Sequence, residues 1–295
     1  MSDHITDVCV YNRRGNFKDY DNDYMQPDTQ NELRRAALGW LSETDPKIKS
    51  AGVIALSQEW AAGRMGLETD TVLASQQVVP GNPQRPELVS HLDVPRRSMR
   101  TMEGRVALIH ALTHIEFNAI NLALDAIWRF AAMPPDYYTD WLKVAAEESR
   151  HFSLLVDHLG TKGYTYGDFA AHSGLWDMVE KTSDDVLARM ALVPRTMEAR
   201  GLDASPPLRA KLWQAGETDA AKIIDIILAD EIGHVLIGNR WFNWICEVRL
   251  LDPVTTYALL AKQYKAPKLR GPFNLDARRA AGFSEDELIA LAATE

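Results

Sequence analysis

The sequence feature that most constrains the fold is a glutamate followed three residues later by a histidine, which occurs twice in stretches of helical period. Glu148 and His151 lie in AEESRHFSLL, and Glu231 and His234 lie in LADEIGHVLIG. Residues three apart on a helix share one face, so each pair can bind a single ion. One such pair is usually solvated at the surface, but a doubled set is a much stronger signal. The chain is therefore predicted to be helical, with metal ligands on two of its helices.

A further glutamate precedes each pair at nearly the same distance. Glu116 lies 32 residues before Glu148, and Glu198 lies 33 residues before Glu231. In a four-helix bundle that holds two metals, one glutamate from each of two helices joins a Glu-x-x-His pair from each of the other two. The break at MPPD lies about midway between Glu116 and Glu148, so antiparallel helices bring these two residues to similar heights. The near-repeat predicts a complete set of six ligands.

Hydrophobic periodicity and helix-end signals predict four long helices and no convincing strand. The long helices are expected at 104–133, 136–160, 183–200 and 219–248. Gly201 is expected to end the third, and Gly216 to follow a short helix at 207–215. Two earlier helices are expected after the capping signal Thr29 to Glu32 and at Pro46, and a last one from about Ser284. The predicted fold is an all-α four-helix bundle.

Composition divides the chain into four parts. Residues 1–27 are a polar extension, 28–103 hold the N-terminal helical subdomain and a Pro/Arg-rich surface loop, 104–250 form the bundle, and 251–295 form a C-terminal covering segment. With 46% apolar and 25% charged residues and no apolar run of about 18, we expect no membrane span. The N-terminus has no apolar run of signal-peptide length, which predicts a cytoplasmic protein. Cys9 and Cys246 are too few for a thiolate cluster, so metal ligands must be oxygen and nitrogen.

Four segments resemble the ferritin-like di-iron carboxylate proteins, namely HIEFNAINLALDA, AAEESRHF, DVLARMALVPRTMEARGLD and ADEIGHV. They look like a bacterial branch of that superfamily known as domain of unknown function 455, over residues 28–290. The resemblance implies a ferritin-like bundle with a dinuclear iron centre. The ligands that it implies are Glu116, Glu148, His151, Glu198, Glu231 and His234.

The third helix offers two candidate ligands. Glu180 lies 18 residues before Glu198 on the same helical face. We favour Glu198 because it lies in a segment that carries the resemblance and follows Pro194, where a kink is expected.

Four carboxylates and two imidazoles balance the charge of two divalent ions and suit iron or manganese. We expect two Fe ions, with Mn as the alternative, and O2 as co-substrate. Two Fe(II) ions can together give two electrons to oxygen, which suits hydroxylation, desaturation or N-oxidation. The predicted function is an oxygen-dependent di-iron oxidoreductase acting on a small organic substrate.

Basic residues in two loops are candidates for binding an anionic substrate. The first loop carries Arg100 and Arg105 together with Arg96 and Arg97, and the second loop carries the other basic residues. The candidates for substrate binding are Arg96, Arg97, Lys265, Lys268 and Arg270. They favour an anionic substrate if both loops lie over one end of the bundle, and otherwise they are an ordinary solvated surface. The segment 265–274 is also expected to cover the metal centre.

Three other functions remain open at this stage. A ferroxidase for iron handling is disfavoured because the N-terminal subdomain and the long loops would obstruct a ferritin cage. A transfer-RNA-modifying hydroxylase is disfavoured by the net charge of −9, which argues against nucleic acid. A non-catalytic metal-binding or metal-free bundle is the third.

Several residues near the predicted ligands admit a structural interpretation. His114 lies about 200° around the helix from Glu116, so His110 and His114 are expected to support or pack rather than to bind the same metals. His158, Trp241 and Trp244 are expected to pack. Small residues that project inward either line a substrate cavity or allow tight helix packing, and these are Ala119, Ala123, Ala191 and Gly238.

Overall fold

The computed structural model describes residues 31–293, and its regular elements are helices. The predicted extension 1–27 and the cap residue Thr29 lie outside this range. Within it, strand-like pairing is limited to two isolated bridges, Glu32 with Gly66 and Leu88 with Ala171. The prediction of an all-α helical bundle is therefore confirmed.

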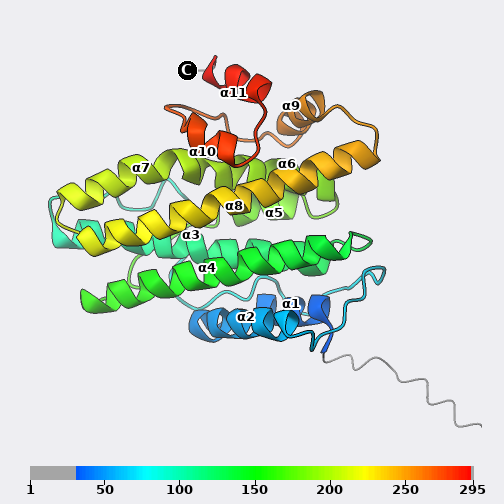
Figure 1. The fold of residues 1–295 in the computed structure, drawn as a ribbon. Helices are drawn as coiled ribbons and strands as arrows, with labels where there is room; N and C mark the ends of the chain where they lie inside the picture. Colours follow the sequence, from blue (N-terminus) through cyan, green and yellow to red (C-terminus); the bar gives the residue numbers. More distant parts are fainter. Residues whose placement is uncertain (1–30, 294–295) are drawn as a thin grey trace, which may run out of the picture.

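The helices stack in four layers (Figure 1). The lowest layer in that view consists of α1 (Leu33–Ser42) and α2 (Pro46–Ala61), and the next of α3 (Met102–Arg129) and α4 (Pro135–Thr161). Above them lie α6 (Val186–Leu192), the π-helical turn η2 (Val193–Glu198), α7 (Ala199–Gln214) and α8 (Thr218–Val248). The top layer consists of α9 (Pro253–Gln263), α10 (Leu275–Ala280) and α11 (Glu285–Ala292). The short helix α5 (Trp176–Lys181) leads into α6.

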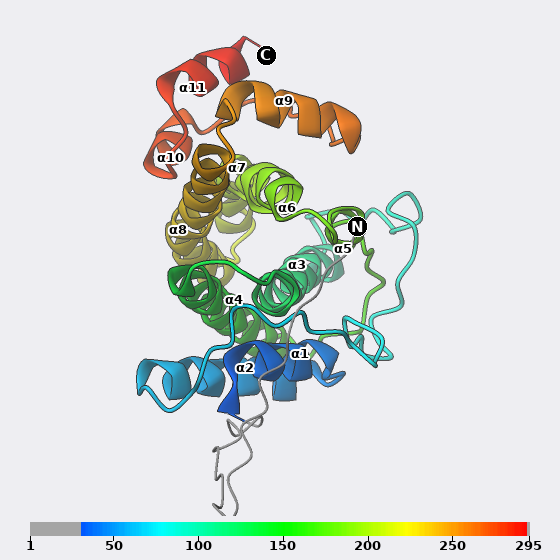
Figure 2. The same ribbon diagram turned by 90° about the vertical axis from the view of Figure 1, so that its right-hand side faces the viewer.

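The two middle layers form the bundle that carries the predicted ligands. Helix α3 packs along α4, α4 packs on α8, and α8 packs on α6, η2 and α7. Figure 2 shows this arrangement from one end, with α1 and α2 on one side and α9 to α11 on the other.

Local signals explain where the long helices begin and end. The Thr101 side chain accepts a hydrogen bond from the backbone N–H of Gly104 and caps α3. Proline in the first turn of α4 suits that position because its missing N–H needs no partner there. Gly216, at φ +81°, separates α7 from α8 in a conformation that favours glycine. The predicted bounds of α3, α4 and α8 agree with the structure to within a few residues.

The prediction for the third helix was wrong at its C-terminal end. Gly201 does not stop it, since α7 continues through Gly201 to Gln214 and includes Pro206 and Pro207. A helical glycine costs only about 1 kcal/mol relative to alanine, which tertiary packing can override. Helix α7 obtains that packing along α8 and η2.

The kink expected at Pro194 takes the form of the π-helical turn η2. Proline has no N–H to donate and its ring clashes with the carbonyl four residues earlier, so a regular α-helix cannot pass through it. The chain widens instead. The backbone N–H of Ala199 donates to the carbonyl of Pro194, and the Thr196 hydroxyl donates to the carbonyl of Ala191 at 2.8 Å.

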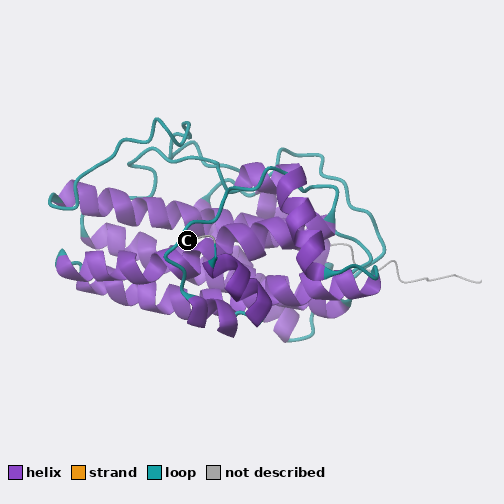
Figure 3. Cartoon of the chain, turned by 90° about the horizontal axis from the view of Figure 1, so that it is seen from above, coloured by secondary structure: helices purple, strands orange, loops and turns teal. Residues whose placement is uncertain are grey.

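Two fully buried cations attach the N-terminal layer to the bundle. Arg34 donates to the carbonyl oxygens of Thr71 at 2.7 Å and Trp128 at 2.8 Å. The Lys49 ammonium donates to Asn121 Oδ1 at 2.6 Å and to two carbonyl oxygens. Residues 64–101 then connect α2 to α3 without a helix, and Figure 3 shows the loops along one side of the long helices.

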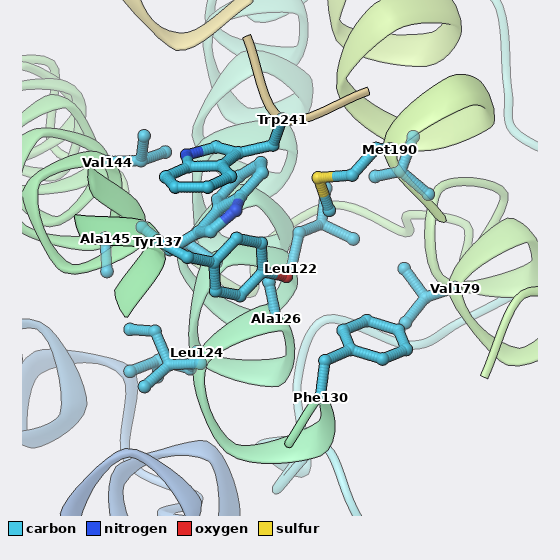
Figure 4. Close-up of a cluster of buried hydrophobic side chains, with 14 of the residues drawn as sticks. Leu122, Leu124, Ala126, Phe130, Tyr137, Val144, Ala145, Val179, Met190 and Trp241 are labelled. Atoms are coloured by element: carbon cyan, nitrogen blue, oxygen red, sulfur yellow. The ribbon is translucent and has the colours of Figure 1, made fainter. Parts of the chain in front are cut away.

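A hydrophobic core fills the bundle on one side of the predicted ligands. Tyr137 from α4, Trp241 from α8, Leu122 from α3 and Met190 from α6 meet there (Figure 4). Burying each such side chain contributes about 1.5–3 kcal/mol. None of the helices among residues 31–293 has the length and apolarity needed to cross a membrane.

Candidate metal centre

The six predicted ligands are all buried, with between 0 and 8% of their surface exposed. They come from four different elements of the bundle. Helix α3 carries Glu116, α4 carries Glu148 and His151, η2 carries Glu198, and α8 carries Glu231 and His234.

Five of the six form two overlapping groups that can each hold a metal ion. Glu116, Glu148 and His151 form the first group, and Glu148, Glu231 and His234 form the second. Within each group one ligand atom per residue lies within 4.8 Å of the others. Glu148 belongs to both groups, so its carboxylate is common to the two possible metal sites.

Glu198 belongs to neither of these two groups. It is the last residue of η2, and its Oε2 has no hydrogen-bond partner. Burial and the negative charge of Glu148 raise the pKa of Glu198 to about 7, and the His234 charge lowers it. Glu198 is buried, and η2 packs on α8, the helix that carries Glu231 and His234.

Each histidine is oriented by a carboxylate from the opposite helix. The Nε2 of His151 on α4 lies 3.0 Å from Asp230 Oδ2 on α8. The Nε2 of His234 on α8 lies 2.9 Å from Glu147 Oε2 on α4. A carboxylate in this position accepts the Nε2 proton, which leaves Nδ1 of the neutral ring as the nitrogen that can bind metal.

Both Nδ1 atoms point at carboxylate oxygens. His151 Nδ1 lies 3.3 Å from Glu116 and 3.2 Å from Glu148, and His234 Nδ1 lies 2.9 Å from Glu148. A nitrogen lone pair and a carboxylate oxygen do not attract each other unless a proton or a metal cation lies between them. Five buried atoms of the cluster have no hydrogen-bond partner, namely Glu116 Oε2, Glu148 Oε1, Glu198 Oε2, Glu231 Oε2 and His234 Nδ1. The donor set therefore fits metal cations.

The pKa values show how strongly the cluster needs positive charge. Burial, together with the charge of Glu148, raises the pKa of Glu116 to about 8 and that of Glu231 well above its usual range. Burial alone would lower the pKa of His151, but Glu116 and Glu148 raise it to about 11. Burial opposes the ionisation of Glu148, yet His234 and His151 hold its pKa below the ordinary value. Metal ions would displace the protons that these shifts retain.

The remaining sequence candidates lie elsewhere. Glu180 is on α5, where it accepts a hydrogen bond from Trp176 Nε1 at 3.1 Å. His114 is buried and lies within hydrogen-bonding distance of the Tyr166 hydroxyl and Asn118, as the packing interpretation predicts. His110 accepts the backbone N–H of Gly167.

The two basic loops are attached to different layers of the helix stack. Arg105 pairs with Glu217 immediately before α8, whereas the segment 265–270 joins α9 to α10 in the top layer (Figure 1). Arg96, Arg97, Lys265, Lys268 and Arg270 are all exposed. Binding of an anionic substrate by these residues stays a prediction.

Gly238 also resolves one open alternative in favour of packing. A Cβ atom at Gly238 would lie 2.5 Å from Pro194 Cβ and 2.7 Å from Pro194 Cγ. Pro194 of η2 therefore occupies the space beside Gly238, which leaves no room there for a substrate.

Glu147, Asp230 and Arg150 were not predicted from the sequence to belong to the site. Arg150 is more than half exposed and lies 3.5 Å from Glu147 and 4.0 Å from Asp230, so it neutralises the two outer carboxylates together. The signal was present in the near-repeat: each Glu-x-x-His pair is directly preceded by an acidic residue, in EESRH and in DEIGH.

The fold and the cluster define the class: a helical bundle with buried Glu/His groups that can bind metal. The model of a family described as "Protein of unknown function (DUF455)" matches residues 42–289, and the chain belongs to this family. It is 48% identical over 229 residues to an "Uncharacterized protein" of Haemophilus influenzae, covering 75% of this chain and 80% of that relative. No solved structure matches the chain.

Proposed function

We propose that the cluster binds two iron ions and that the protein is an oxygen-dependent di-iron oxidoreductase of the ferritin-like superfamily, acting on a small organic molecule. One observation supports the proposal most strongly. The Nδ1 atoms of His151 and His234 both lie close to carboxylate oxygens of Glu148, the residue that the two groups share. A shared carboxylate between two three-residue groups is the arrangement expected of a dinuclear site.

The chemistry of the ligands supports iron, with manganese as the alternative. Four carboxylates and two imidazoles offer hard oxygen and borderline nitrogen atoms and no thiolate. Two Fe(II) ions held by these ligands would supply two electrons to oxygen together.

The protein's own groups hold the site in place and keep it dry. Asp230 and Glu147 accept the Nε2 protons of the two histidines and thereby fix both rings. Burial of every ligand excludes bulk water, which protects an oxidising centre from stray reductants. A site that is held rigidly and kept from bulk water suits redox chemistry on a bound substrate.

Metal analysis of the purified protein, followed by anaerobic reconstitution with Fe(II) and optical spectroscopy on oxygen addition, tests the proposal. We expect about two ions per chain and an absorption change that develops with oxygen and depends on Glu148. One zinc ion per chain, or no metal, would refute it. Continued uptake of iron far beyond two per chain would instead support iron handling.

A further inference from the structure

Arg195 in η2 is enclosed by three aromatic rings. The centre of its guanidinium lies 4.8 Å from the ring centroid of Phe242, 5.1 Å from that of Tyr257 and 4.9 Å from that of Phe283. Phe242 belongs to α8, but Tyr257 lies on α9 and Phe283 lies just before α11. The side chain is only 2% exposed, so the C-terminal segment supplies most of this enclosure.

Polar contacts connect Arg195 to the same segment. One guanidinium nitrogen donates to Asn239 Oδ1 on α8 at 2.8 Å, and another pairs with Glu287 on α11. Glu287 also completes the capping box of α11 with Ser284. The charge of a buried arginine is costly to leave unpaired, so α11 has to stay docked for Arg195 to keep its place.

The C-terminal segment contacts the chain on both sides of Glu198, in η2 before it and at the start of α7 after it. Before it, the Thr196 hydroxyl lies 3.0 Å from the hydroxyl of Tyr257. After it, Arg278 on α10 donates to the carbonyl oxygen of Ala199 at 3.2 Å. The backbone that carries Glu198 is thus fixed from outside the bundle.

A π-helical turn needs such fixing because it is rarer and less stable than regular α-helix. It contains in effect one extra residue, and one residue corresponds to a rotation of about 100° around a helix. If the turn relaxed, Glu198 would rotate away from the second group of ligands. Glu116, on the regular helix α3, is not subject to this rotation.

We propose that Arg195 is a positioning residue, through which the docked C-terminal segment keeps η2 in its π-helical form and aims Glu198 at the second metal site. The inference rests on the proposed function in one respect, namely that Glu198 binds metal. It predicts that the second site (Glu148, Glu231, His234) depends on the C-terminal segment and that the first site (Glu116, Glu148, His151) does not.

The test is a metal titration of the full-length protein with Co(II), whose visible absorption reports coordination. In Arg195→Met, which keeps a long apolar side chain between the rings, one of the two binding steps should lose about tenfold in affinity or more while the other is unchanged. Arg195→Lys should recover part of the loss. Arg34→Met is the matched control: it removes another buried arginine and should lower the melting temperature without changing either step.

Two substitutions at partly exposed residues test the link between the C-terminal segment and the second site with less risk to folding. Glu287→Gln keeps the cap of α11 but removes the negative partner of Arg195, and Tyr257→Phe keeps the ring but removes the contact with Thr196. Each should weaken the same step by a few-fold. Amide hydrogen exchange of the metal-free protein should also become faster at residues 195–199 in Arg195→Met but not in Arg34→Met.

The outcomes separate the two proposals. If the wild type binds two ions and Arg195→Met binds both with unchanged affinity, the positioning inference is wrong and the dinuclear site stands. If the wild type binds no ion, both proposals fail.

Discussion

The two halves of the candidate metal centre carry the same ligand pattern on different backbones. Glu116, Glu148 and His151 project from α3 and α4, which are uninterrupted helices packed along each other. Glu231 and His234 project from a regular helix too, but Glu198 sits at the end of a π-helical turn bordered by three C-terminal helices. Two different backbone conformations can therefore carry the same ligand pattern, provided that the ligand side chains point toward the same place.

The largest effect on metal binding is expected at Glu148, which belongs to both halves. Glu148→Gln keeps the shape of the side chain but removes the charge that both groups need, so the metal content should fall from about two ions per chain to nearly none, with affinity lowered about 100-fold or more. Elemental analysis of the purified variant measures this. Asp157→Asn, an exposed acid on the same helix, should keep both ions. A variant that retains one full ion would show that Glu148 serves only one half.

Removing either histidine should break one half at a time. His151→Ala and His234→Ala should each lose about one ion per chain because each ring is the only nitrogen ligand of its group. His114→Ala should keep both ions, although losing its buried hydrogen bonds costs about 1–3 kcal/mol of stability. Isothermal titration with Fe(II) under anaerobic conditions measures all three. Equal losses would refute the assignment of His114.

Glu147 and Asp230 each contact the histidine of the opposite helix, so substitutions at these two residues distinguish the two halves. Glu147→Gln should weaken the site of His234, and Asp230→Asn that of His151, each by about 10- to 100-fold. In a His151→Ala background, Glu147→Gln should therefore weaken the remaining ion, whereas Asp230→Asn should have little further effect. The same titration measures both double variants. The reverse pattern would show that each acid acts on its own helix.

The smallest effect is expected at the contact between η2 and α8. Gly238→Ala places a methyl group against Pro194 and should cost about 1–3 kcal/mol of folding free energy. It should also weaken metal binding a few-fold in the second half alone. Gly233→Ala, on the same helix with nothing within 4 Å of the new Cβ, should stabilise by about 0.5–1 kcal/mol. Urea unfolding measures both, and equal stabilities would contradict the close contact seen here.

The first half was more predictable from sequence than the second because its signals are local. Periodicity, the Thr101 cap and the MPPD break are each read from neighbouring residues, and together they bring Glu116 level with Glu148. The second half depends on distant contacts. Nothing within a few residues of Pro194 reports that Arg195 is enclosed by Tyr257 and Phe283, so a kink was predicted without its π-helical form.

The missed carboxylates have a different cause. A residue directly before a ligand points about 100° away from it on the helix, so Glu147 and Asp230 were not expected at the site. Each reaches a histidine on the opposite helix because α4 and α8 pack side by side. This relation between helices is visible in the sequence only after the pairing of the helices is known.

Glu148 has one further consequence, for the order in which ions enter. In the proposed two-ion site, the first ion would fix the orientation of a carboxylate that the second also needs, which would favour the second, while its positive charge would repel the second. Whichever effect is larger acts equally on both ions, since coupling between two binding events is reciprocal. If orientation dominates, scarce iron gathers as complete pairs in a few chains. If repulsion dominates, it spreads as single ions over many chains, each with only half of the electrons that a two-electron oxidation requires.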